Sequence, residues 1–346
     1  MLLSYPPSRT FLTRPITLAR QTMQPIKSIF PNISNISMER SISYSLEPKV
    51  ELPLPSVTAK SWSICNARNG ECLWSKAPNN RLEMASLTKM MTAYLSCFLA
   101  ERFQINIEKT MIIVSKPMVM IGGTLGDLKE GDNISLLNLL YGIMLPSGND
   151  CALAIAGYFG ALLLEKFLRN AKQHVEVTFE QMVRRFIKEM NSLALKLALK
   201  NTSFANVHGL SHKGNKSTAE ELGKLACHLL KSPLIRDIVK TKIHSFNVYN
   251  LFIDNMRTVV WRNTNRLLGR EGFSGVKTGT TPNAGACLTL LYCKDEVEMI
   301  VTVLACNSTK HRWDEGKLLA EWGYKNYLIK GTRNARKMLY SAKTER

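Results

Sequence analysis

The sequence has no apolar run long enough to cross a membrane without interruption. The longest candidate, "CALAIAGYFGALLLEKF" at 151–167, is interrupted by charge and is better interpreted as a buried helix. A hydrophobic fraction of 45% and a charged fraction of 21% are typical of a soluble globular protein and exclude a largely disordered chain. We therefore expect no transmembrane segment, and 346 residues are enough to bury a sizeable core.

The sequence also lacks a C-x-x-C pair and any His/Cys spacing typical of a metal site. This absence predicts that the protein binds no metal and needs no cofactor. Several of the eight cysteines lie in apolar stretches, where a buried free thiol is the usual explanation, and nothing in the pattern requires disulfides. The cysteines are Cys65, Cys72, Cys97, Cys151, Cys227, Cys287, Cys293 and Cys306.

Acidic residues are absent from residues 1–38, which carry Arg9, Arg14, Arg20 and Lys27 among many Ser, Thr and Pro. This composition predicts a leader over 1–45, either a transit-type targeting segment or a disordered tail. A secretory signal needs a longer apolar centre than "MLLSYPP" provides. The compartment is left open.

Basic residues outnumber acidic ones, giving a formal net charge of +19. Such an excess fits binding to nucleic acid or to an anionic membrane or cell-wall polymer. The basic residues are spread along the chain, with concentrations near both ends, and no RNA- or DNA-binding signature accompanies them. We therefore predict a generally cationic surface and no nucleic-acid partner.

Hydrophobic periodicity predicts strands, then a largely helical middle, then strands and a final helix. "VTAKSWSICNARNGECLWSK" (57–76) is typical of two strands joined by a turn at Asn69-Gly70, and helices are expected from near Ser86 to about residue 200 and over 217–231. The runs "FSGVKTG", "AGACLTLLYC" and "EMIVTVLACN" favour strands, and "RWDEGKLLAEWGYKNYL" favours an amphipathic helix. This order predicts an α/β (α+β) protein, a sheet packed by helices with a helical insertion.

The stretch "MASLTKMMTAYL" (84–95) places Ser86 and Lys89 three residues apart at a helix start. Residues three apart share one helical face, so the lysine amine can approach the serine hydroxyl and act as its base. A lysine does this only if burial or nearby cations lower its pKa. The alternative is that Ser86 caps a helix and Lys89 faces water.

Two further segments support the catalytic interpretation. "PSGND" (146–150) presents Ser147 and Asn149 in a turn before a helix, and "VKTGT" (276–280) places Lys277 at the end of an expected strand. Ser-x-x-Lys, Ser-x-Asn and Lys-Thr-Gly in this order are the signature of penicillin-recognising serine acyl-transfer enzymes. Taken singly, the second motif could cap a helix and the third could be a charge at a strand edge.

The chain resembles the catalytic domain of serine-type D-alanyl-D-alanine carboxypeptidases, the low-molecular-mass penicillin-binding proteins of peptidase family S11. The likeness covers about residues 55–330 and includes "MLPSGNDCALAIA", "NTSFANVHGLSHKGNKSTAEELGKLA", "NTNRLLG", "GVKTGTTPNAGACL" and "RWDEGKLLAEWGY". It implies a β-lactamase/transpeptidase-like fold, an antiparallel sheet flanked by helices with an all-helical subdomain. The domains expected are a leader at 1–45, a catalytic domain at 46–330 with a helical lobe at about 95–232, and a basic tail at 331–346.

The resemblance implies a role for each residue at the catalytic centre. Ser86 is the expected nucleophile that forms an acyl-enzyme, and Lys89 the base that takes its proton. Ser147 is expected to relay a proton to the leaving amine, while Asn149 holds the substrate amide and positions Lys89. The backbone N–H groups of Ser86 and Thr280 are the expected oxyanion hole.

The resemblance also implies a substrate-binding group made of Lys277, Thr278, Gly279, Thr280 and Arg312. Lys277 is expected to keep the site electropositive and so lower the Lys89 pKa. The terminal carboxylate of the substrate is expected to bind Thr278, Thr280 and Arg312, whose guanidinium offers a fork of donors. The implied partners are a peptidoglycan peptide ending in D-Ala-D-Ala and β-lactam antibiotics as covalent inhibitors.

Several departures from the family keep alternatives open. We expect no counterpart of its C-terminal β-rich domain or amphipathic anchor, since the chain ends soon after Tyr327, and no secretory signal although the family usually acts outside the cytoplasm. "EKFLRN" (165–170) resembles the deacylating E-x-x-L-N segment of class A β-lactamases but has one residue too many and follows Ser-Gly-Asn too closely. The alternatives are a penicillin-binding protein without catalysis and a β-lactamase-like homologue.

Overall fold

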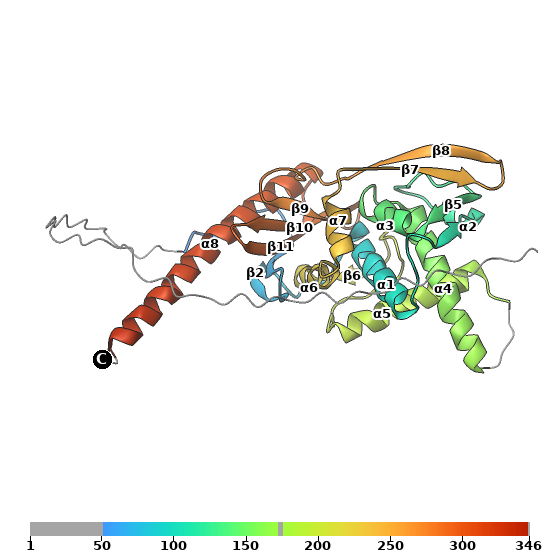
Figure 1. Ribbon diagram of the computed structural model, residues 1–346. Coiled ribbons are helices and arrows are strands. Elements are labelled where there is room, and N and C mark those ends of the chain that lie inside the picture. The colour runs from blue at the N-terminus through green and yellow to red at the C-terminus, as the bar shows by residue number, and fades with distance from the viewer. Residues whose placement is uncertain (1–50, 172–175, 345–346) are drawn as a thin grey trace, which may run out of the picture. The chain divides into compact units, whose positions relative to one another are not determined.

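The computed structural model describes residues 51–171 and 176–344, and Figure 1 shows their arrangement. The leader predicted at 1–45 lies outside these residues. Residues Lys49–Arg346 form one compact unit. The last helix continues through the segment predicted as a basic tail.

A five-stranded antiparallel sheet has the order β2-β1-β11-β10-β9. The hairpin predicted at 57–76 is confirmed: β1 and β2 pair, and Gly70 in their turn has a φ of +77°, which glycine adopts easily. β1 also pairs with β11, so the first strand lies beside the last. The strands are β1 (Ser61–Asn66), β2 (Cys72–Lys76), β9 (Phe273–Thr281), β10 (Gly285–Lys294) and β11 (Val297–Cys306).

One face of this sheet is covered by the N-terminal part of α8 (Thr309–Thr344), which packs against β10 and β11, while its C-terminal part extends beyond the sheet in Figure 1. Alternate strand residues point to that face, since successive side chains of a strand point to opposite faces. Trp62, Leu288 and Val301 are fully buried there, together with Leu319 of the helix. The amphipathic helix predicted at 312–328 is thus confirmed and extends further.

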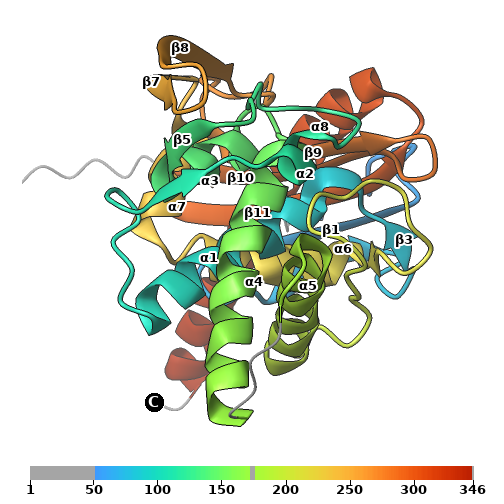
Figure 2. The same cartoon turned by 90° about the vertical axis from the view of Figure 1, so that its right-hand side faces the viewer.

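The opposite face packs against α6 and a lobe of further helices (Figure 2). Most of the core lies here, and Met90, Leu139, Ile155 and Phe186 are all fully buried. The helices are the 3-10 helix η1 (Ala85–Thr88), α1 (Lys89–Arg102), α2 (Lys116–Val119), α3 (Leu136–Met144), α4 (Asn149–Ala171), α5 (Phe179–Lys196), α6 (Ala219–Leu229) and α7 (Pro233–Lys240). The helices predicted near residue 86 and over 217–231 are confirmed within a few residues.

Two smaller sheets went unpredicted. A pair of short strands, β3 and β6, joins the segment before η1 to the segment before α6, and a four-stranded sheet has the order β4-β5-β7-β8. The strands β3 to β6 have only two to four residues each and carry too little alternation to be detected from sequence, whereas β7 and β8 have eight residues each and were also not predicted. The strands are β3 (Leu82–Glu83), β4 (Met111–Ile113), β5 (Asp132–Ser135), β6 (Lys216–Ser217), β7 (Ile243–Asn250) and β8 (Asn255–Arg262). Because β4 and β5 fall within 95–232, the lobe predicted as all-helical also contains strands.

Within the described residues, one stretch, Asn149–Arg169 in α4, is long and apolar enough to cross a membrane by length and composition. Half of that window is buried inside the protein. The helix packs against α1, α3 and α5, and Phe159 is fully buried among them. The sequence interpretation of this run as a buried helix agrees with that packing.

Candidate active site

Ser86 and Lys89 lie where η1 passes into α1, on the same side of the helix as predicted. Lys89 is fully buried, and its Nζ lies 3.2 Å from Ser86 Oγ, 2.7 Å from Asn149 Oδ1 and 2.6 Å from the carbonyl oxygen of His208. Ala85, directly before Ser86, has a φ of +48° although it is not glycine. Strain of this kind persists only where surrounding contacts hold it, and it is common at functional sites.

Burial lowers the pKa of Lys89 from 10.5 to about 7, because the charged ammonium is removed from water. Cys151 and Asp150 act in the opposite direction and raise this pKa, with a smaller combined effect. The Lys89 amine is therefore partly neutral near pH 7. A neutral amine within hydrogen-bond reach of a hydroxyl can take its proton.

Ser147 and Asn149 come from the turn before α4. The Asn149 side chain accepts from Lys89 through Oδ1 and donates through Nδ2 to the carbonyl oxygen of Gly122 at 2.7 Å, which fixes the orientation of its amide. Ser147 is almost fully buried with a φ of +71°, and its Oγ has no hydrogen-bond partner in the described part of the chain. An unpaired buried hydroxyl costs about 1–3 kcal/mol, so a bound ligand that hydrogen-bonds to it would recover that energy.

Asp150 fixes the loop that faces this turn. Its buried carboxylate accepts from the backbone N–H groups of Gly126 at 2.7 Å and Leu128 at 3.1 Å, and from Cys151 at 2.8 Å. Asp150 thus connects the start of α4 to the loop that supplies the Gly122 carbonyl.

The edge strand β9 lies directly against η1. A Cβ added to Gly279 would lie 2.6 Å from the Ser86 backbone nitrogen, so only glycine permits this approach. Lys277 and Thr278 precede it on β9 and are buried, and Thr280 follows at the surface. Lys277 Nζ donates to the carbonyl oxygen of Thr278 at 3.0 Å.

Arg312 reaches β9 from the first turn of α8. Its Nη1 donates to Thr280 Oγ1 at 2.9 Å and to the carbonyl oxygens of Gly279 at 3.1 Å and Cys287 at 3.3 Å. Its Nε is buried without a partner among the described residues. The structure thus brings two groups of predicted residues together, Ser86–Lys89–Asn149 and Gly279–Thr280–Arg312, and the close approach of Gly279 to Ser86 joins them.

Comparison with known proteins assigns the chain to a family. The family model described as D-alanyl-D-alanine carboxypeptidase, peptidase family S11, matches residues 48–176 and 182–308. The chain belongs to this family. The D-alanyl-D-alanine carboxypeptidase of Streptomyces sp. (strain K15) is 31% identical over 80% of this chain and 91% of its own length. DacC of Escherichia coli (strain K12) is 30% identical over 82% of this chain, which spans 65% of the DacC length.

Solved structures give the same result for the fold. The Streptomyces K15 DD-transpeptidase matches with a TM-score of 0.70 and 31% identity, over 79% of this chain and all of that one. The carboxypeptidase DacD of Francisella tularensis matches with a TM-score of 0.66 and 25% identity, over 80% of this chain and 72% of that one. The predicted β-lactamase/transpeptidase-like fold is confirmed.

The effect of Lys277 on Lys89, which the family resemblance implied, stays a prediction. Lys277 was expected to lower the Lys89 pKa through its charge, whereas the largest cause of that lowering is burial. Burial, with the nearby charges of Lys89 and Arg312, lowers the Lys277 pKa well below 10.5.

Sequence reasoning also missed two residues of the site. The carbonyl oxygen of His208 accepts from Lys89, and Gly209 has a φ of +93° with space for no side chain, because a Cβ would lie 2.1 Å from the Ala85 carbonyl oxygen. The signal was the segment "VHGL", which was quoted for the resemblance but given no role. Burial lowers the His208 pKa to about 4, so its imidazole is neutral at pH 7.

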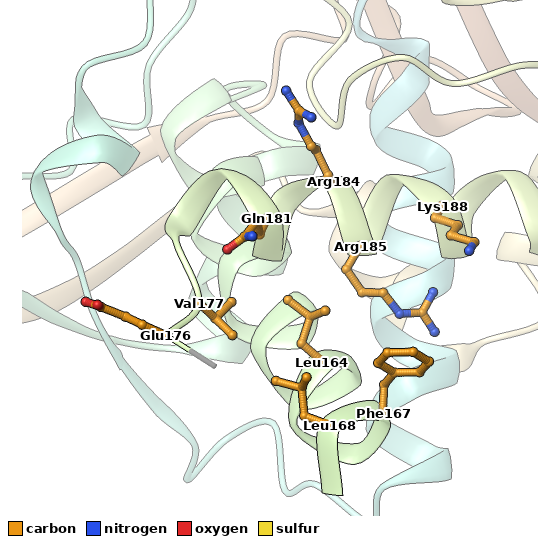
Figure 3. A pocket seen from close by; sticks show the side chains of 9 residues that line it. All are labelled: Leu164, Phe167, Leu168, Glu176, Val177, Gln181, Arg184, Arg185 and Lys188. Atoms are coloured by element: carbon orange, nitrogen blue, oxygen red, sulfur yellow. The ribbon is translucent and has the colours of Figure 1, made fainter. Parts of the chain in front are cut away.

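Two other features lie outside the group of predicted site residues. The Glu165 side chain is 52% exposed and paired with Arg169, an unsuitable environment for activating a deacylating water. An apolar pocket of about 430 Å³ between α4 and α5, shown in Figure 3, contains Leu164, Phe167 and Val177 but none of the predicted site residues. In the described part of the chain, no group of three or more His, Cys, Asp or Glu side chains is placed to hold a metal ion.

Proposed function

We propose that the protein is a serine-type D-Ala-D-Ala carboxypeptidase in which Ser86 forms the acyl-enzyme. The observation that carries this proposal is the environment of Lys89, which is fully buried, has a pKa near 7 and lies 3.2 Å from Ser86 Oγ. A neutral amine has two N–H donors and one lone pair. The two N–H groups donate to Asn149 Oδ1 at 2.7 Å and to the His208 carbonyl oxygen at 2.6 Å. The lone pair of the nitrogen is then left to accept the proton of the Ser86 hydroxyl.

In the proposed acylation, Lys89 takes the proton of Ser86 while Oγ attacks the carbonyl carbon between the two terminal D-alanines. The negative charge on the carbonyl oxygen is stabilised by the backbone N–H groups of Ser86 and Thr280. The C–N bond then breaks, and the proton passes to the leaving amine through the hydroxyl of Ser147. Water hydrolyses the ester in the second half, with Lys89 again acting as the base.

The proposed substrate is a peptidoglycan stem peptide ending in D-Ala-D-Ala. We assign its terminal carboxylate to the hydroxyls of Thr278 and Thr280 and to Arg312, and its amide to Asn149. The charge of the Arg312 guanidinium, largely buried and with an unpaired Nε, supports this assignment. β-Lactam antibiotics would acylate Ser86 in the same way and leave slowly. We place the catalytic domain at 46–330, in a compartment where such peptides are present.

The proposal is tested by labelling the purified protein with a fluorescent penicillin and locating the adduct by intact-mass and peptide mass spectrometry. We expect a stable adduct on Ser86, none in Ser86→Ala, and acylation slowed by about 10²–10⁴-fold in Lys89→Ala, because general-base catalysis is lost. Lys109→Ala, an exposed lysine, is the control and should label normally.

Release of D-alanine from a pentapeptide by the same preparations tests the carboxypeptidase step. No adduct on a correctly folded wild-type chain would support the alternative of a non-catalytic homologue. An adduct that turns over rapidly would support the β-lactamase-like alternative instead.

A further inference from the structure

Cys65 on β1 and Cys72 on β2 are direct cross-strand neighbours, at the edge of the sheet away from β9. Asn66, next to this pair, closes the turn: its N–H donates to the Glu71 carbonyl oxygen at 2.8 Å, and its carbonyl oxygen accepts from the Gly70 N–H at 2.9 Å. Directly opposite residues of antiparallel strands have Cα atoms about 4.5–5.5 Å apart in either type of pair, and Cys65 and Cys72 are such register partners. That separation lies inside the range of about 4.4–6.8 Å that a disulfide spans.

Both cysteine side chains lie on the α6 face of the sheet. A Cβ added to Gly223 of α6 would lie 2.7 Å from Cys65 Sγ, so this sulfur points at the helix. The charges of Glu220 and Lys224, also on α6, act on the Cys72 thiol. The two sulfurs are therefore on the same side of two paired strands, which a cross-strand disulfide requires.

The neighbouring residues on the two strands support this direction of the Cys65 and Cys72 side chains. Ile64 and Trp74, the neighbouring register pair, point to the opposite face. There the Trp74 ring packs edge-on against Trp322 of α8, with centroids 5.4 Å apart, and Ile64 lies beside Gly323. A register shift between Ile64 and Cys65 accommodates the extra residue of β2, so both register pairs keep their facing.

The two thiols differ in accessibility and acidity. Cys65 is fully buried, whereas Cys72 is partly exposed. The interaction of the two thiols lowers the pKa of Cys72, and the same interaction together with burial raises the pKa of Cys65. Cys72 is thus the thiol that ionises and meets an external oxidant first.

We propose that Cys65 and Cys72 form an intramolecular disulfide when the folded protein meets a small-molecule disulfide such as oxidised glutathione. The Cys72 thiolate attacks one glutathione sulfur, forming a mixed disulfide and releasing one glutathione thiolate. The Cys65 sulfur then attacks the Cys72 sulfur, gives its proton to solvent, and releases the second glutathione. Two protein thiols are oxidised and one glutathione disulfide is reduced to two thiols.

The remaining cysteines are not arranged in this way. Among the described strand pairs, Cys65 with Cys72 is the one in which cysteine faces cysteine. Cys287 and Cys306 lie on adjacent strands but belong to the cores on opposite faces of the sheet. The proposed bond would pin the edge strand β2, and it would persist in an oxidising compartment but not in a reducing one.

The test uses the full-length folded protein, incubated with oxidised glutathione, alkylated and digested with trypsin without reduction. Trypsin separates the two cysteines, giving SWSICNAR (61–68) and NGECLWSK (69–76). We expect these peptides linked, at a mass two hydrogens below their sum, and separated again by a reductant. Cys97→Ser should keep the link, whereas Cys72→Ser should abolish it and leave Cys65 free.

A parallel sample of the protein unfolded in urea, in which every thiol is accessible, shows that the oxidant is active. If the thiols of the unfolded sample are oxidised while Cys65 and Cys72 of the folded protein are both recovered alkylated, the proposal is overturned. It is also overturned if either cysteine is found linked elsewhere, for example to Cys227, whose Sγ donates to the Ala67 carbonyl beside the same turn at 3.2 Å. Because the wild-type peptide map decides the matter, failure of a variant to fold leaves the test intact.

Discussion

At the scale of single residues, the site depends on where one lysine is buried. Lys89 is held by partners 60 and 119 positions further along the chain, Asn149 and His208. Neither partner is charged. The ammonium form therefore gains hydrogen bonds from them, but no opposite charge that would offset the free energy it loses when it is removed from water. This is why its pKa is lowered to about 7 rather than raised.

The pH dependence of acylation should therefore show an acid limb with a midpoint near 7. Below that pH Lys89 is protonated and cannot take the Ser86 proton, so the acylation rate should fall about tenfold per pH unit. The measurement is kcat/KM, or the penicillin acylation rate, from pH 5 to 9. A midpoint near 4 would instead implicate His208, whose pKa is lowered to about 4.

Stability must be followed in parallel. Between about pH 7 and 10.5 the unfolded chain binds the Lys89 proton that the folded chain has lost, so stability rises with pH across this window. Below pH 7 both states are protonated and the full penalty of burial applies. Melting curves at each pH confirm that the acid limb is not unfolding.

Asn149→Asp should move the acid limb to higher pH. The new carboxylate replaces the amide oxygen 2.7 Å from Lys89 Nζ and stabilises the ammonium, raising the Lys89 pKa by about one unit or more. We expect acylation at pH 7 to fall by at least about tenfold and to recover partly at high pH. Asn247→Asp, the same substitution on the exposed face of β7, is the control. An unchanged midpoint in Asn149→Asp would exclude Lys89 as the titrating base.

At the scale of elements, β9 and η1 are brought together by the absence of a side chain at Gly279. A Cβ there would lie 2.6 Å from the Ser86 nitrogen and 2.9 Å from the Ala85 Cβ, closer than packed atoms allow. The strand therefore has to carry glycine if its backbone is to lie beside the nucleophile. The glycine of the Lys-Thr-Gly motif therefore permits the short distance between β9 and η1, in addition to the role in substrate binding that we propose for the motif.

Gly279→Ala should separate β9 from η1 and slow acylation by about 10²-fold, because displacements of this size misplace the reacting groups. Gly331→Ala is the matched control, since a Cβ there meets nothing within 4 Å. The readout is the penicillin acylation rate, with circular dichroism to show that the variant is folded. Wild-type acylation by a folded Gly279→Ala would mean that this approach is not needed for catalysis.

At the scale of the whole molecule, the start of the described chain is fastened to its last helix. The buried carboxylate of Glu315 accepts from the Thr58 N–H at 2.8 Å, the Thr58 hydroxyl at 2.6 Å and the Ala59 N–H at 3.0 Å. This contact spans more than 250 positions and holds the segment before β1 against α8. It lies outside the site and should act on stability alone.

Glu315→Gln should lower the free energy of unfolding by about 1–3 kcal/mol, because a buried charged acceptor is replaced and part of its hydrogen bonding is lost. Glu321→Gln on the same helix, where the side chain is 42% exposed and lies 3.7 Å from Lys317, should change it by less than about 1 kcal/mol. Urea denaturation gives both values. Equal effects from the two substitutions would contradict a special role for Glu315, and penicillin acylation of the folded Glu315→Gln should be normal.

The sequence by itself determined the family, the fold class and the residues that meet at the site. Motif spacing is a local property, and the long helices and paired strands carry a periodicity that sequence displays directly. One or more residues of each motif, namely Ser86 and Lys89, Asn149, and Gly279, accordingly lie in contact.

Only the tertiary structure decided which further groups contact the site and what sets the pKa of Lys89. The His208 carbonyl, the close passage of Gly209 and Gly279 past η1, and the burial that sets the Lys89 pKa all arise from contacts between distant segments. The β7–β8 hairpin and the Cys65–Cys72 neighbourhood likewise depend on strand pairing and register. Desolvation and close packing depend on all the atoms that surround a residue in space. Most of those atoms belong to distant segments, so the sequence of one segment does not show them.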